Sequence, residues 1–130
     1  MAIEPPPARR GLRRSLAAGG VYDLALGIFI LLAGRPVMAG LGHPVPDHAA
    51  FYFALGALPL LLLPALYVAA SRAADLGPFR LPALWARAGG GGMLVFLSIA
   101  FRPEPIWIFL AIGILDGMWA ALHAILWRRR

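Results

Sequence analysis

The sequence lacks cysteine and lysine and contains few charged residues. The absence of cysteine excludes disulfides, thiolate metal sites and cysteine nucleophiles. All twelve basic residues are arginine, which fits a GC-rich coding bias better than a selected guanidinium function. Only 14% of the 130 residues are charged and 61% are apolar, whereas about 25% of an ordinary soluble domain is charged. A soluble chain of this length could not bury so much apolar surface, so the composition indicates a membrane protein.

Groups with catalytic potential are also scarce. The three serines, Ser15, Ser71 and Ser98, have no partner base in the sequence, so we expect no enzyme activity and no catalytic residues. His43, Asp47 and His48 have the composition of a metal site, but the prolines between them favour a turn. We therefore expect neither a metal nor a cofactor.

Four apolar stretches are each long enough to cross a hydrocarbon core, which takes about 20 helical residues. These predicted spans cover residues 16–34, 49–70, 83–101 and 106–127. A basic arm over residues 1–15 precedes them, and a basic tail over residues 128–130 follows. The sequence thus predicts an all-α fold, a bundle of four transmembrane helices forming one domain over residues 16–127.

The third stretch contains four consecutive glycines, Gly89–Gly92, which are poor helix formers in water. In lipid an open backbone is more costly still, so this stretch should remain helical when its neighbours pack against it. The alternative is a broken or re-entrant segment.

The positions of the arginines predict the orientation. With four spans, one side of the membrane receives ten arginines and the other receives only Arg35 and Arg102. This asymmetry predicts that both termini lie in the cytoplasm. Because the arginines lie at span ends, we expect them to contact lipid headgroups and expect no nucleic acid. The expected partners are the lipid bilayer and other membrane subunits or further copies of the chain.

Two aspartates interrupt the apolar stretches, Asp23 in the first and Asp116 in the fourth. Counting at 1.5 Å per residue places both, the four glycines and the carbonyl of Leu60 at roughly 9–16 Å from the cytoplasmic edge. Pro64 leaves that carbonyl without its helical partner. The sequence therefore predicts one polar layer to which every span contributes.

Small residues share a helical face with each aspartate, and they allow close helix packing. The packing positions that we expect are Gly20, Gly27, Gly91, Gly113 and Gly117. We expect the first and fourth spans to touch through these faces, with both aspartates directed inward. Two carboxylates in a dry layer would not both ionise readily without a cation. Arg87 could reach one of them and His123 the other.

Five aromatic residues lie near the predicted span boundaries: Trp85, Trp107, Trp127, Tyr52 and Tyr67. Tryptophan and tyrosine concentrate at membrane–water interfaces. We therefore expect these residues to form an interfacial belt.

Short motifs carry a resemblance to a known family. They include Tyr22-Asp23-Leu24 in the first span, Gly42-His43-Pro44-Val45-Pro46 in the outer loop and Asp116-Gly117-Met118-Trp119 in the fourth span. Together they resemble small four-helix bacterial membrane proteins distantly similar to the DoxX type. The resemblance implies the four-helix topology, and because that family has no agreed activity, it implies no function.

Three functional hypotheses follow. The first is a non-enzymatic subunit or scaffold of a membrane assembly, because the chain has almost no extramembrane part. The second is a proton-coupled or small-molecule carrier that uses Asp23, Asp116 and His123. The third is a redox or pigment-binding subunit that uses His123 as a ligand.

Overall fold

The computed structural model describes residues 7–73 and 75–128, and every regular element within them is helical. In chain order the elements are α1 (Pro7–Phe29), the π-helix η1 (Ile30–Gly34), α2 (Arg35–Gly40), α3 (Asp47–Leu55), α4 (Leu58–Arg72), the 3₁₀-helix η2 (Gly77–Phe79), α5 (Arg80–Phe101) and α6 (Ile106–Arg128). Residues 1–6 of the predicted basic arm and residues 129–130 of the predicted tail lie outside the described residues.

Within the described ranges, four helical segments are long and apolar enough to cross a membrane. They are Arg10–Gly40, Asp47–Arg72, Gly77–Phe101 and Ile106–Arg128. The predicted all-α class is therefore confirmed, and each of the four predicted spans corresponds to a helical segment with the length and composition to cross a membrane. Length and composition make the chain compatible with a small membrane protein.

The first helical segment is longer at both ends than predicted. Helix α1 begins at Pro7, inside the predicted arm and before the candidate span itself. This early start is stabilised because Leu12 and Leu16 share one helical face and are fully buried in the core. The segment also continues past the expected stop at Pro36. A proline ring in an α-helix clashes with the carbonyl four residues earlier. The turns before Pro36 are those of the wider π-helix η1, and α2 follows directly.

The middle segments also exceed their predicted bounds. The second starts at Asp47 and ends at Arg72, with a turn between α3 and α4. Pro59 lies in the first turn of α4, where the backbone nitrogen has no helical partner to lose. The third has its α-helical part from Arg80 to Phe101 without interruption. The glycines are thus helical, and the alternative of a re-entrant segment is wrong.

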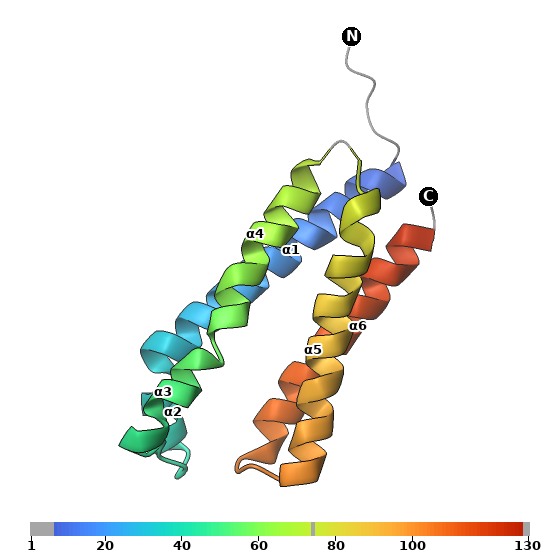
Figure 1. The fold of residues 1–130 in the computed structure, drawn as a ribbon. Coiled ribbons are helices and arrows are strands. Elements are labelled where there is room, and N and C mark those ends of the chain that lie inside the picture. The colour runs from blue at the N-terminus through green and yellow to red at the C-terminus, as the bar shows by residue number, and fades with distance from the viewer. Residues whose placement is uncertain (1–6, 74, 129–130) are drawn as a thin grey trace.

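The helices form two antiparallel pairs, α1 with α4 and α5 with α6 (Figure 1). The start of α1, the link from α4 to α5 and the end of α6 lie together, and we call this the terminal end. The loop between α2 and α3 and the link from α5 to α6 lie at the opposite end, the far end. Most contacts are made within each pair, which we call a hairpin.

Glycines set the packing inside each hairpin. On α1, a Cβ added at Gly27 would lie 2.9 Å from Leu61 of α4, and one at Gly20 would lie 3.2 Å from the Tyr67 Cβ. Between α5 and α6, a Cβ at Gly91 would lie 2.8 Å from the carbonyl oxygen of Gly113. Four of the predicted packing glycines therefore allow close approach of two helices.

The first and fourth spans do touch, and both aspartates point inward to Arg87, as predicted, but the glycine faces of these two spans do not meet. Gly20 and Gly27 of α1 face α4, and Gly113 of α6 faces α5, because each helix packs mainly against the other helix of its own hairpin. A Cβ added at Gly117 would meet nothing within 4 Å, so this glycine faces open space. The α1–α6 contact is confined to a few places, such as Gly19 with His123.

The hydrophobic core lies toward the terminal end. Its buried members are Leu12, Leu16, Tyr67, Ala70, Leu76, Ala83 and Trp127. Two members of the predicted interfacial belt, Tyr67 and Trp127, therefore belong to the core instead, with 0% and 5% of their surface exposed. Large rings there fill space among small alanines of neighbouring helices.

Candidate functional site

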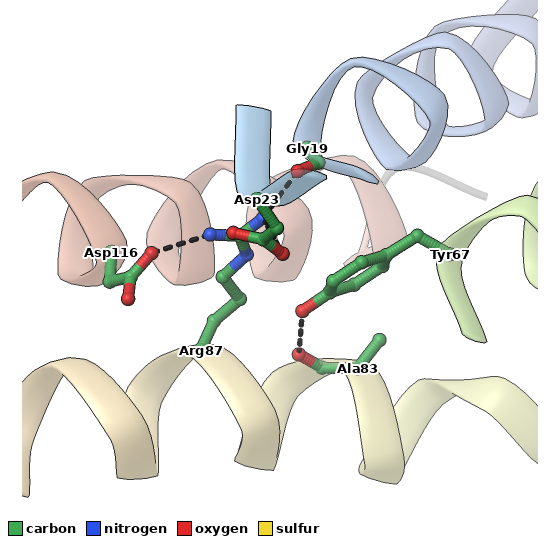
Figure 2. A network of polar contacts seen from close by, with 6 residues as sticks. All are labelled: Gly19, Asp23, Tyr67, Ala83, Arg87 and Asp116. Carbon is green, nitrogen blue, oxygen red and sulfur yellow. Dashed lines mark hydrogen bonds and ion pairs between the residues drawn. The ribbon is translucent and has the colours of Figure 1, made fainter. Parts of the chain in front are cut away.

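Arg87 of α5 lies at the centre of a buried polar network (Figure 2). Its Nη2 donates to the Asp23 carboxylate at 2.7 Å and to the Gly19 carbonyl at 2.8 Å, both on α1. Its Nη1 donates to Asp116 Oδ1 on α6. The guanidinium thus links its own helix, α5, to α1 and to α6, and the bonds to α1 join the two hairpins.

The local sequence explains this geometry. Gly19 and Asp23 are four residues apart, so both face the same side of α1. The absence of a side chain at Gly19 lets the guanidinium approach the backbone, because a Cβ there would lie 3.1 Å from Nη2. Gly91, one turn beyond Arg87, lies against the Cβ of Asp116 and brings α6 within reach.

Aromatic rings surround the guanidinium. Its Cζ lies 5.6 Å from the ring centroid of Tyr22, 5.0 Å from that of Tyr67 and 5.9 Å from that of Trp119. Ring faces attract cations, and the attraction is stronger where water is excluded. The Tyr67 hydroxyl also donates to the Ala83 carbonyl at 3.5 Å, as Figure 2 shows.

The two carboxylates have different environments. The Asp23 side chain is fully buried, and its Oδ1 accepts no hydrogen bond from the described residues. The Asp116 side chain is 13% exposed and lines a groove described below. With both carboxylates ionised and His123 neutral, the layer has one positive and two negative formal charges.

His123 of α6 is fully buried and pairs with no carboxylate among the described residues, since Arg87 holds both Asp23 and Asp116. Its ring lies between Trp119 at 5.8 Å and Tyr67 at 6.1 Å, with the Ser15 backbone nearby. Neither ring nitrogen forms a hydrogen bond of normal geometry within residues 7–73 and 75–128. The expectation that His123 serves the second aspartate is wrong, because Arg87 is long enough to reach both.

A groove of about 470 Å³ opens between the hairpins on the far side of the polar layer. It is lined mainly by apolar residues from both hairpins, including Ala86, Gly90 and Leu94 of α5, and by the carboxylate of Asp116. Leu26, Leu60 and Ile112 are typical lining residues. Asp116, a partner of Arg87, borders the groove, so the groove adjoins the polar network.

At the start of α3, Asp47 accepts a hydrogen bond from Arg35 at 2.6 Å, and its side chain is almost fully exposed. The part of the chain that the structure describes contains no group of three or more His, Asp or Glu side chains placed to hold a metal ion.

Sequence reasoning named Asp23, Arg87 and Asp116, which the structure brings together, but it missed Gly19, Tyr67 and the groove. The glycine could have been found, since it stands four residues before Asp23. Tyr67 was assigned to the interface because of its place near the span end.

Comparisons with protein-family models, with curated proteins and with solved structures found no match to this chain. The similarity to DoxX-type bundles therefore remains an expectation based on short motifs.

Proposed function

We propose that the chain is a small, non-enzymatic integral membrane protein that acts as a subunit or scaffold in a membrane assembly. The observation that carries this proposal is the bonding of Arg87 to Asp23 and Asp116 across both hairpins. Interior charges that are bound to each other fix helix positions, and buried polar groups can specify one arrangement. The polar layer therefore serves the fold, which presents an apolar exterior to its neighbours.

The exterior supports the proposal. Large apolar side chains are exposed on all four segments, including Leu32 at 78%, Phe51 at 69%, Phe101 at 77% and Met118 at 63%. Such surface is stable only against lipid or another apolar protein surface. We infer partners of two kinds, the bilayer itself and neighbouring membrane subunits or further copies of this chain.

The test of this role is extraction in native lipid discs with a C-terminal tag, followed by native mass spectrometry. We expect the chain to leave the membrane with a second protein or as an oligomer in fixed proportion. An unrelated four-span protein with the same tag serves as the control. A monomer, or the same proteins recovered with the control, would contradict the proposal.

We further propose that the terminal end lies in the cytoplasm and the far end outside it, in a bacterial inner membrane. The basic residues support this, since Arg13 and Arg80 lie near the terminal end and Arg13 donates to the Ala73 carbonyl there at 2.6 Å.

Single cysteines at Asp47 and Asp75 test the orientation in this cysteine-free chain. A membrane-impermeant maleimide should label intact cells at residue 47 and leave residue 75 unlabelled until the cells are opened. The reverse pattern would invert the orientation.

A further inference from the structure

The groove between the hairpins has the size and lining of a small-molecule site. Its volume of about 470 Å³ falls in the range typical of such sites, roughly 300–1,000 Å³. Its walls are apolar side chains of both hairpins, among them Phe29, Leu63 and Phe109. The apolar part of a ligand could therefore move from lipid into the groove without losing hydrogen bonds.

The polar groups at the groove are mainly acceptors. Asp116 Oδ1 is bound by Arg87, whereas its Oδ2 accepts no hydrogen bond from the described residues. Leu60 lines the groove, and Pro64 cannot supply the N–H that its carbonyl would normally receive. Tyr52, the other polar side chain of the lining, lies on α3 at the far end.

The donors of Arg87 are not accessible from the groove. Its side chain is 1% exposed, and both terminal nitrogens already donate to carboxylates or to the Gly19 carbonyl. A ligand that needs a donor, such as a carboxylate, would find none beside Asp116 and would meet a negative charge. A ligand that brings donors would find a free carboxylate oxygen.

Among ligands with hydrogen-bond donors, the formal charge of the polar layer favours a cation. Arg87 neutralises one of the two carboxylates, so the layer retains one negative formal charge beside an apolar groove. An unbalanced charge at membrane depth is costly. A ligand with one positive charge balances it, and a hydrogen bond between charged groups is stronger than one between neutral groups.

From these observations we propose that the groove binds a small lipophilic ammonium compound. The apolar body lies between the hairpins, and the ammonium group donates to Asp116 Oδ2. This inference goes beyond the scaffold role and does not rest on it, because binding and partner recovery are measured separately.

Three probes with the same body test the proposal: 1-adamantylammonium, 1-adamantanol and adamantane-1-carboxylate. Binding is measured by equilibrium dialysis at pH 7 against the protein in lipid nanodiscs, with empty nanodiscs to subtract partition into lipid. We expect the ammonium to bind roughly tenfold more tightly than the alcohol, because a charged hydrogen bond exceeds a neutral one by about 1.4 kcal/mol, which is tenfold. The carboxylate should remain at the level of the empty discs.

Two matched variants locate the binding. A Cβ added at Gly90 or Gly92 would meet nothing within 4 Å, so leucine at either position should fold, but only Gly90 lines the groove. We expect Gly90→Leu to reduce ammonium binding about tenfold, the loss from filling a pocket, and Gly92→Leu to leave it unchanged. Asp116→Asn should remove the preference for the ammonium over the alcohol, with circular dichroism confirming the fold.

Several results would overturn the proposal. Equal binding of ammonium and alcohol would mean that a proton balances Asp116. Binding of every probe at the empty-disc level would mean that lipid chains fill the groove. Equal loss in Gly90→Leu and Gly92→Leu would place the site elsewhere.

Discussion

The terminal half and the far half of the molecule contain the same four spans but hold them together differently. In the terminal half, buried residues from α1, α4, α5 and α6 form one core beside the network of Arg87. In the far half, contacts run within each hairpin, as between Gly34 and Phe53, and a groove separates the pairs. The hairpins thus associate at one end and separate toward the other (Figure 1).

The difference indicates which contacts would hold these helices together in a membrane. Lipid chains are as apolar as leucine, so close packing and hydrogen bonds between helices must provide the attraction. Gly27 and Gly91 provide close packing inside the hairpins. The bond of Arg87 to Asp116 lies inside the α5–α6 hairpin. Between the hairpins, Arg87 donates to Asp23 and to the Gly19 carbonyl, both on α1. Removing those bonds should therefore have the largest effect on the fold.

Arg87→Met tests this comparison most severely. It leaves Asp23 and Asp116 without their cation in a dry layer, and removing one partner of a buried pair costs roughly 3–5 kcal/mol. We expect that loss in the free energy of unfolding, measured by denaturant titration in bicelles. Arg35→Met removes the exposed pair with Asp47 at the far end and should cost less than about 1 kcal/mol.

A triple variant separates charge from shape in the same region. Combining Arg87→Met with Asp23→Asn and Asp116→Asn removes every charge of the network, so much of the lost stability should return. If the triple variant is no more stable than Arg87→Met alone, the arginine acts through its packing between rings and not through its charge.

Gly91→Leu tests the packing that brings α6 to Arg87. The added side chain would overlap the Asp116 Cβ and the Gly113 carbonyl, each 2.8 Å from a Cβ at Gly91. Overpacking typically costs about 1–3 kcal/mol, and we expect that loss in the same titration. Gly92→Leu, on the open face of the same helix, is the control. Equal stability of the two variants would show that α5 and α6 can separate freely.

The sequence predicted how far along each helix the polar groups lie better than it predicted which neighbouring helix each face meets. The rise per residue of a helix is constant, so counting placed Asp23, Asp116 and the four glycines Gly89–Gly92 in one layer, toward which Arg87 was expected to reach. Which helix each face meets depends on how all four spans pack, and counting does not contain that information. The pairing of the glycine faces was therefore predicted wrongly, although four of the five glycines do allow close packing.

Local signals failed at other positions for the same reason. Pro36 indicated a helix end, but the turns of η1 precede it and the helix continues to Gly40. Tyr67 lies near a span end and was expected at the interface, whereas the neighbouring helices bury it completely. The groove follows from the position of two hairpins relative to each other, and no local motif in the sequence specifies that position.

The two aspartates sharpen the comparison between the halves, because Asp23 is fully buried and Asp116 borders the groove. Replacing either with asparagine keeps the shape and removes one charged bond to Arg87, for which about 1.5–3 kcal/mol is typical. We expect Asp23→Asn to cost more than Asp116→Asn in the free energy of unfolding. The reverse order would indicate that Asp116, and not Asp23, is the main anion of Arg87.

The smallest effect concerns one substitution made in each half. Tyr67→Phe in the terminal half removes a hydroxyl that donates to Ala83 at 3.5 Å, while the ring beneath Arg87 remains. A typical hydrogen bond contributes about 0.5–1.5 kcal/mol. Because this distance is long for an O–H donor, we expect a loss at the lower end of that range. Tyr52→Phe in the far half, where the ring is 71% exposed, should leave the free energy of unfolding unchanged. A loss at Tyr52 equal to that at Tyr67 would show that the far half is held as firmly as the terminal half, which the open groove argues against.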